Sequence, residues 1–215
     1  MDSALREDMV VEKGGRGPEA EPTEGQLIVL YGVNNLGKST QVDLLVDALS
    51  EAGVDVVRRK SPNYESLSGK QINAILREGK EASSEELQLW QAVNMHQDQR
   101  FISENIENGR VVISEDYWGT TLAWGLGCGV SREELDAMTD GLRPPDITVL
   151  LHGERFLDST EKGHRHEEND DLTDRVQQHH LELAEEFGWN KVSANQAIDD
   201  VHKEIMAIVQ GNLVG

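Results

Sequence analysis

The segment from Gly32 to Thr40 has the residue types and spacing of a phosphate-binding loop, G-x-x-x-x-G-K-[ST]. Two glycines at this spacing let the backbone curl so that successive N–H groups point at phosphate oxygens, and the following helix adds its positive end. Lys38 would neutralise the β- and γ-phosphates, and the Ser39 hydroxyl is placed to bind Mg²⁺. We therefore expect ATP to be bound by Gly32, Val33, Asn34, Asn35, Leu36, Gly37, Lys38, Ser39 and Thr40.

The segments on either side of this motif are those that a phosphate-binding loop requires. Residues 26–31 form a short, mostly apolar run typical of a buried parallel strand, and residues 38–52 carry apolar side chains at helical spacing. A strand, a glycine-containing turn and a helix thus follow in the required order. The alternative, a chance glycine turn with an exposed lysine, is disfavoured by this context.

Composition limits the class of protein. The 215 residues fit one α/β domain, and 40 acidic against 20 basic residues give a net charge of −20, which repels nucleic acid and anionic lipid. One cysteine excludes an intramolecular disulfide, and no apolar stretch approaches the ~20 residues that cross a bilayer. Residues 1–25 are acidic and have no apolar secretory segment, so we expect a disordered tail on a cytoplasmic protein.

Strands and helices alternate along residues 26–215, which predicts a single domain with a parallel sheet covered by helices on both faces. A capping box at Ser131–Glu134 predicts a further helix start. Trp118, Trp124 and the glycine-rich stretch 125–129 are expected to form a buried loop beside the substrate pocket. The remaining expected strands are 54–57, 110–114, 147–151 and 191–193, and the remaining helices are 68–77, 84–108, 172–189 and 196–210.

In this order, the elements resemble the thymidylate kinase family of P-loop nucleoside monophosphate kinases over about residues 27–209. The motifs that carry the resemblance are the phosphate loop, Lys60-Ser61-Pro62, Ser114-Glu115-Asp116-Tyr117, Pro145–Leu150, Arg165-His166-Glu167, Trp189–Gln196 and Val201–Ile205. The resemblance implies the three-layer P-loop NTPase fold, a lid at about residues 153–170 and a homodimer. It also implies Mg²⁺-dependent transfer of a phosphoryl group from ATP to a nucleoside monophosphate, with dTMP as the expected acceptor.

The resemblance also implies roles for individual residues. Lys38 and the lid residue Arg165 would act on the transferring group, and Glu115 would hold Mg²⁺ together with Ser39, although a solvated strand-end acid is the alternative for Glu115. Asp116 would share that role or accept a hydrogen bond from the sugar hydroxyl. The expected substrate-binding residues are Lys60, Pro62, Gln91, Asn94, Asp116 and Tyr117.

The chain departs from the family on the acceptor side of the expected site. Asn34 replaces the family's sugar-binding acid, and Gln91 replaces its base-stacking aromatic residue. Arginines that some or all members carry are replaced by Asn35, Met95 and Asp116. Lys60, Arg100 and Arg165 are the candidates to supply the missing positive charge. Two other hypotheses therefore stay open: a kinase of this fold for a deoxynucleoside or another monophosphate, and an ATP-binding protein without transferase activity.

Several histidines raise the hypothesis of a zinc site. His164, His166 and Glu167 are close in sequence, and His179 and His180 follow. Adjacent helical residues point about 100° apart, which argues against joint binding of one metal by the last two.

Overall fold

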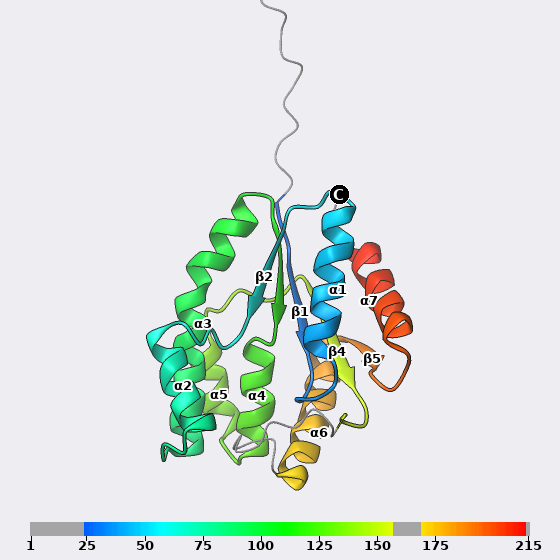
Figure 1. Ribbon diagram of the computed structural model, residues 1–215. Helices are drawn as coiled ribbons and strands as arrows, with labels where there is room; N and C mark the ends of the chain where they lie inside the picture. The colour runs from blue at the N-terminus through cyan, green and yellow to red at the C-terminus, as the bar shows by residue number, and fades with distance from the viewer. Residues whose placement is uncertain (1–23, 157–168, 214–215) are drawn as a thin grey trace, which may run out of the picture.

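Five parallel strands form the centre of the molecule in the computed structural model, which describes residues 24–156 and 169–213 (Figure 1). Their order across the sheet is β2-β3-β1-β4-β5. This confirms the predicted α/β class with a parallel sheet. The strands are β1 (Leu27–Tyr31), β2 (Val56–Lys60), β3 (Val111–Glu115), β4 (Ile147–His152) and β5 (Asn190–Ser193).

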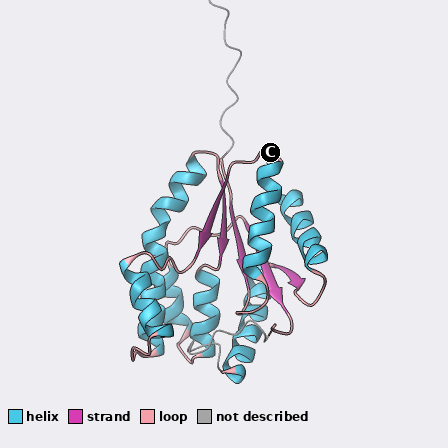
Figure 2. Cartoon of the chain, viewed as in Figure 1, coloured by secondary structure: helices cyan, strands magenta, loops and turns pink. Residues whose placement is uncertain are grey.

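Helices cover both faces of the sheet, as the cyan helices around the magenta strands show (Figure 2). One face is covered by α1 (Lys38–Glu51) and α7 (Ile198–Asn212). The other is covered by α3 (Ser84–Glu107), α4 (Trp118–Gly127) and α6 (Asp170–Phe187), with α2 (Leu67–Arg77) packed on α3 and α5 (Arg132–Thr139) on α4. Within the described ranges, no helix has the length and apolar character needed to span a bilayer.

The parallel register brings the carboxyl ends of the strands to one edge of the sheet. Lys60 at the end of β2 lies opposite Glu115 at the end of β3, and Glu115 lies opposite Leu30 of β1. The strand order reverses at β1, which lies between β3 and β4. The connections on the two sides of this point run in opposite directions, which leaves a crevice for ligands at the carboxyl ends of the strands.

The edge strand β2 begins two residues later than the predicted strand at 54–57, because the basic residues 58–60 belong to it. They alternate between its faces: Arg59 pairs with Asp98 of α3 and stacks over Phe101, with its guanidinium carbon 4.6 Å from the ring centre. Arg58 and Lys60 instead reach Glu115. The other strands and the helices that were predicted agree with the structure to within about two residues, and the predicted capping box at Ser131 is confirmed.

The expected loop at residues 118–129 is wrong, because most of it forms the helix α4. Its glycines allow close packing instead of breaking the helix. A Cβ atom on Gly119, Gly125 or Gly127 would lie 2.5, 2.4 and 2.6 Å from the side chains of Trp189, Leu135 and Val176, respectively. The sequence signal for a loop was thus a signal for tight helix packing.

A small second core joins α2 to α3 beyond the edge of the sheet. It is formed by Ile72, Ile75, Leu76 and Leu87, which are at most 5 % exposed, with Tyr64, Ala82 and Trp90 packed against them. The main core lies between the sheet and its helices. The second core therefore fixes α2 and the first turns of α3 as a wall over the carboxyl edge of the sheet.

We predict that Gly119→Ala destabilises the protein by about 1–3 kcal/mol, because the added methyl group would lie within 3.0 Å of the rings of Trp189 and Tyr31. Urea unfolding measures the change. Gly211→Ala in α7 is the matched control, since no heavy atom lies within 4 Å of its added carbon, and helix propensity favours it by up to ~1 kcal/mol. Equal effects of the two changes would contradict the packing role of Gly119.

Candidate active site

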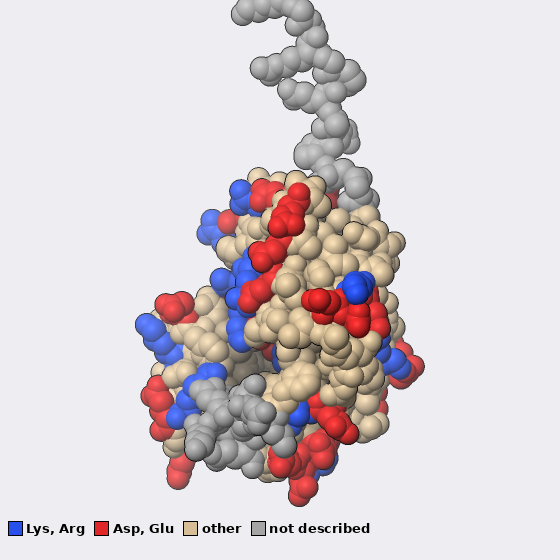
Figure 3. Space-filling model, turned by 45° about the vertical axis from the view of Figure 1, so that its right-hand side comes forward, with Lys and Arg blue, Asp and Glu red and all other residues tan. Residues whose placement is uncertain are grey.

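A cavity of about 530 Å³ lies at the carboxyl edge of the sheet. The space-filling view shows this side of the molecule hollowed, with acidic and basic side chains intermingled around it (Figure 3). Its walls come from the loop between β1 and α1, the ends of β2 and β3, the helices α2, α3 and α4, and residues 194–201. All residues of the predicted phosphate loop from Asn34 to Thr40 line it.

The backbone of the phosphate loop curls as its glycines predicted. Gly32 has φ of 142°, and a Cβ there would lie 2.5 Å from the carbonyl oxygen of Leu151. Gly37 has φ of 78° at the start of α1, and Asn35 has φ of 63°. Asparagine adopts this left-handed region more readily than most residues, so the loop keeps its shape at Asn35 without a third glycine.

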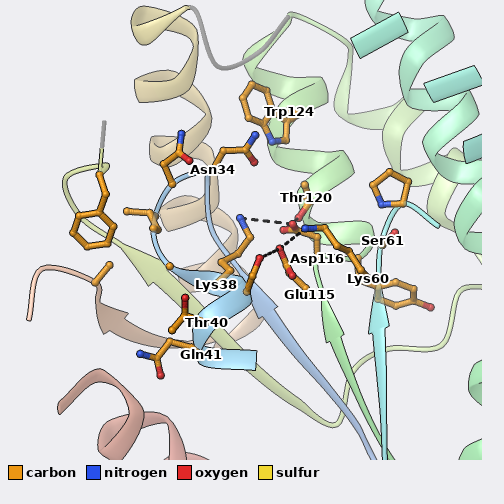
Figure 4. Close-up of a pocket in the computed structure, with 18 of the residues that line it drawn as sticks. Asn34, Lys38, Thr40, Gln41, Lys60, Ser61, Glu115, Asp116, Thr120 and Trp124 are labelled. Atoms are coloured by element: carbon orange, nitrogen blue, oxygen red, sulfur yellow. Dashed lines mark hydrogen bonds and ion pairs between the residues drawn. The ribbon is translucent and has the colours of Figure 1, made fainter. Parts of the chain in front are cut away.

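Lys38 extends along the phosphate loop towards the acids at the end of β3. Its ammonium group donates hydrogen bonds to the carbonyl oxygens of Gly32 (2.7 Å) and Val33 (3.0 Å), and lies 3.6 Å from Asp116 Oδ2 (Figure 4). The side chain is only 6 % exposed. A buried positive charge is thus held at the mouth of a backbone loop that suits phosphate.

The Glu115 carboxylate connects the phosphate loop with β2. Its Oε1 accepts hydrogen bonds from Ser39 Oγ (2.8 Å) and Lys60 Nζ (2.7 Å) (Figure 4). Its Oε2 is buried and accepts no hydrogen bond, although Arg58 Nη2 is 3.5 Å away. Burial raises the pKa of Glu115, but the charges and hydrogen bonds of Lys60, together with Lys38 and Ser39, outweigh it, so this pKa lies below its ordinary value.

This arrangement fits Mg²⁺, which prefers oxygen ligands and is commonly bound by one or two protein groups together with phosphates and water. Ser39 offers a hydroxyl, and Glu115 offers a buried oxygen that has no hydrogen-bond partner. Residues 24–156 and 169–213 contain no group of three or more His, Cys, Asp or Glu side chains that could hold a metal alone. A metal at this position would therefore depend on the bound nucleotide.

The neighbouring Asp116 has a different environment. Its φ of 62° turns the chain out of β3, and its Oδ1 accepts a hydrogen bond from Thr120 Oγ1 (2.7 Å). Burial raises the pKa of Asp116 more than the charge of Lys38 lowers it. Adjacent carboxyl groups whose pKa values move in opposite directions are suited to different roles. Glu115, the stronger acid, is the better metal ligand.

Four of the predicted substrate-binding residues besides Asp116 line the cavity: Lys60, Pro62, Gln91 and Tyr117. The Tyr117 hydroxyl accepts a hydrogen bond from Gln99 Nε2 (2.5 Å), and burial raises its pKa to about 12. The side chain is therefore a neutral, fixed wall at neutral pH.

Asn94 is not among the residues that line the cavity, and its role in substrate binding stays a prediction. Its Oδ1 accepts a hydrogen bond from the Asn63 backbone N–H (2.7 Å). Its Nδ2 donates to the Asn63 carbonyl (3.1 Å) and contacts the hydroxyls of Ser66 and Ser68. The amide is thus fully used in holding the loop between β2 and α2. We interpret Asn94 as a positioning residue.

Of the predicted compensating cations, Lys60 lines the cavity and Arg165 lies outside the described residues. Arg100 pairs with Glu104, and its side chain is 87 % exposed away from the cavity, so it is excluded as a compensating cation. Arg77 lines the cavity instead, with its guanidinium carbon 4.8 Å from the centre of the Tyr64 ring. Sequence reasoning missed both Arg77 and Tyr64, because only the packing of α2 on α3 brings them to the site.

The opposite end of the cavity lies beyond the phosphate loop. Phe156 donates a backbone hydrogen bond to the carbonyl oxygen of Asn35 (2.8 Å), and Ala194, Gln196 and Ile198 line the same region. Ala194 and Gln196 belong to the motif at Trp189–Gln196, but no binding role was predicted for them, and no motif marks Phe156 or Ile198. Arg165 and the central part of the expected lid at 153–170 lie outside the described residues, and so do His164, His166 and Glu167. At the base of this segment, Arg155 pairs with Asp170.

The two described histidines of the zinc hypothesis, His179 and His180, have different environments. His179 contacts Glu182 on the surface (2.9 Å), whereas His180 is 1 % exposed near Tyr31. Neither ring nitrogen of His180 has a hydrogen-bond partner. Burial, together with the charge of Lys38, lowers the pKa of His180 to about 3.

Comparisons with known proteins agree on one family. A family model described as thymidylate kinase matches residues 30–205. A putative thymidylate kinase of Invertebrate iridescent virus 6 is 30% identical over 190 residues, which cover 87% of this chain and 89% of that protein. A probable thymidylate kinase of Pyrococcus abyssi is 29% identical over 203 residues, covering 89% and 98%. A solved structure of thymidylate kinase from Candida albicans has a TM-score of 0.74 at 24% identity and covers 88% of this chain and 92% of its own.

We predict that His180 makes the protein acid-sensitive. The unfolded chain binds a proton at His180 below its ordinary pKa of about 6.5, whereas the folded protein keeps this ring neutral down to about pH 3. Stability is therefore lost as the pH falls below about 6.5, by about 2 kcal/mol between pH 7 and pH 5. Denaturant unfolding of the wild type and of His180→Gln at both pH values measures this loss, which the variant should largely lack.

His179→Gln is the matched control, because His179 lies at the surface. It should keep the pH dependence of the wild type. If His180→Gln also keeps the full loss between pH 7 and pH 5, the acid sensitivity comes from other groups.

Proposed function

The chain belongs to the thymidylate kinase family, and on this basis we propose that it transfers the γ-phosphoryl group of ATP to the 5′-phosphate of dTMP, giving ADP and dTDP. The family is one of nucleoside monophosphate kinases. The observation that carries the proposal is that Lys38, Ser39 and Glu115 meet in the middle of a cavity that extends to both sides. One side can take the donor nucleotide and the other the acceptor.

On the donor side, the backbone N–H groups of residues 32–40 would surround the phosphates, and Lys38 would bind between the β- and γ-phosphates. Among the described residues, Lys38 contacts the carbonyl oxygens of Gly32 and Val33 in the loop and the carboxylate of Asp116 at the end of β3. Phosphate oxygens would give it stronger, charge-assisted hydrogen bonds than these carbonyls. The nucleobase would lie towards Phe156, Gln196 and Ile198, which line that end of the cavity.

Glu115 and Ser39 would hold Mg²⁺, because Glu115 keeps one buried oxygen without a hydrogen-bond partner. The ion, when bound, neutralises charge that develops on the β- and γ-phosphate oxygens. Lys60 now donates to the other oxygen of Glu115 and also lines the acceptor side. Lys60 would therefore bind an acceptor phosphate and connect metal binding with acceptor binding.

Catalysis would consist of positioning and charge stabilisation, since phosphoryl transfer requires little covalent chemistry from the protein. Lys38, Lys60 and Arg77 are the described cations that line the cavity. The further assignment of Arg165 as a catalytic lid arginine rests on its Arg-x-Glu context in the sequence and stays a prediction. Asp116, with its raised pKa, is suited to a hydrogen bond with the acceptor sugar.

A second candidate is supported by the replaced residues on the acceptor side: a kinase of the same fold that prefers another monophosphate or a deoxynucleoside. ADP release from ATP and Mg²⁺, measured with a panel of nucleosides and monophosphates, separates the two functions. Fastest turnover with dTMP supports the proposal, and fastest turnover with another acceptor supports the second candidate. Tight ATP binding with no turnover of any acceptor would contradict both and leave an ATP-binding protein.

We predict that Lys38→Ala lowers kcat/KM with dTMP by at least about 10²-fold, because a preorganised positive charge is removed from the transferring phosphates. The fold should remain, as near-native unfolding curves would show. As a matched control, Lys70→Ala removes a lysine from α2, outside the cavity, and should leave turnover unchanged. Near-normal turnover by Lys38→Ala would exclude the phosphate loop as the active centre.

We also predict that Glu115→Gln weakens Mg²⁺-dependent turnover more than Asp116→Asn does. Both changes keep the shape of the side chain, but only the first removes the ionised group beside Ser39. The Mg²⁺ concentration that gives half-maximal turnover should rise for Glu115→Gln and stay close to that of the wild type for Asp116→Asn. The reverse order would assign the metal to Asp116.

A further inference from the structure

Gln88 is a buried amide with an unused hydrogen-bonding atom at the wall of the cavity. Its side chain is 1 % exposed, its Oε1 is buried without a hydrogen-bond partner among residues 24–156 and 169–213, and the residue lines the cavity. A buried acceptor left unsatisfied is destabilising, and native proteins contain few of them. Such an atom in a cavity wall calls for a ligand that completes its hydrogen bonds.

The position of Gln88 determines which part of a substrate can reach it. Asp98 of the same helix pairs with Arg59, the neighbour of Lys60 in β2. Gln88 lies ten residues before Asp98 in α3, which corresponds to about 15 Å along the helix axis. Lys60 thus marks one end of the acceptor side, and Gln88 lies towards the other end, where Leu76 and Leu87 share the second core and Arg77 also lines the cavity. A nucleotide whose phosphate lies at Lys60 would extend its base towards Gln88.

The surroundings of Gln88 also suit a nucleobase. Leu76 and Tyr64 pack in the second core with Leu87, the neighbour of Gln88, and both line the cavity, as does Trp124; they offer flat or apolar surfaces for the faces of a ring. Gln91 follows Gln88 by three residues, on the same side of α3, and lines the cavity as well. The side chain of Met95, one turn further, is buried outside the cavity lining. Neutral amides are therefore the polar groups that α3 presents here.

We propose that Gln88 recognises the acceptor base, with its side-chain amide paired to the N3–H and O4 groups of a pyrimidine imide. This inference rests on the proposed function, because a dTMP acceptor supplies such a base. The amide oxygen accepts the N3–H bond, and the amide NH₂ group donates to O4, so both atoms are satisfied once the acceptor is bound. Cytosine has an acceptor at N3 and a donor at position 4, so it opposes this orientation of the amide. Gln88 is thus a residue that determines specificity.

The test compares dTMP with dCMP as acceptors for the wild type and for Gln88→Met, which keeps the length of the side chain and removes its polar atoms. The ratio of kcat/KM for dTMP to that for dCMP should fall at least tenfold in Gln88→Met, with the KM for ATP unchanged. Without acceptor, the variant should be as stable as the wild type or more stable, since an unsatisfied oxygen has been removed. A purely structural role for Gln88 would instead lower stability and leave the ratio unchanged.

Gln97→Met is the matched control, because Gln97 is an exposed residue of the same helix that does not line the cavity. It should keep the acceptor ratio of the wild type. Gln88→Glu is a second, size-conserving variant that keeps an acceptor atom and removes the donor. It should lower turnover of dTMP and raise the relative turnover of dCMP, whose amino group can donate to the carboxylate.

The outcomes separate this inference from the proposed function. Turnover of dTMP by the wild type, with the same acceptor ratio in Gln88→Met and Gln88→Glu as in the wild type, would overturn the role of Gln88 and leave the proposed function standing. A wild type that does not phosphorylate dTMP would overturn both. A lower ratio of kcat/KM for dTMP to kcat/KM for dCMP in the Gln88 variants, with an unchanged ratio in Gln97→Met, supports the inference.

Discussion

The carboxylate of Glu115 is the interaction on which the candidate site depends. It accepts hydrogen bonds from Ser39 at the start of α1 and from Lys60 at the end of β2, so one side chain ties three consecutive parts of the sheet edge together. This is possible because the parallel register sets Glu115 beside both Leu30 and Lys60. The buried charge is balanced by Lys60, Lys38 and Arg58, which keeps it ionised despite its burial.

Local signals in the sequence were sufficient to predict the phosphate loop and the strand and helix beside it. A phosphate loop is defined by its own backbone, so Gly32, Gly37 and Lys38 could be assigned from their spacing alone, and the parallel sheet followed from the alternation of strands and helices. The helix α4 was missed because glycine counts as a breaker in sequence, whereas Gly119 and Gly125 are required here by the side chains of Trp189 and Leu135. Propensity describes a lone helix and gives no information about its neighbours.

The acceptor half could not be predicted in the same way, because it is built by packing between helices. Arg77 and Gln88 belong to separate helices and carry no motif, and the small core around Ile75 and Leu87 brings them to one cavity. Asn94 is a different case. Its resemblance to a family position suggested substrate binding, but its amide is consumed by the loop at Asn63 and Ser66. A residue type retained in a motif can serve the wall of a site without contacting the substrate.

The buried polar atoms that lack partners give the strongest physical link between this fold and its ligands. Glu115 Oε2 and Gln88 Oε1 are both buried without a hydrogen-bond partner among the described residues, and both residues line the cavity. The charge of Glu115 is balanced by its basic neighbours, whereas the desolvation of Gln88 Oε1 is not compensated and lowers the stability of the protein without ligands. Binding of a metal would use the free oxygen of Glu115, and binding of a base would recover the free energy lost at Gln88. Ligand affinity is thus gained from atoms that folding leaves unsatisfied. An apolar substitution at such a position should therefore keep or raise the stability of the protein while it lowers its specificity for the ligand.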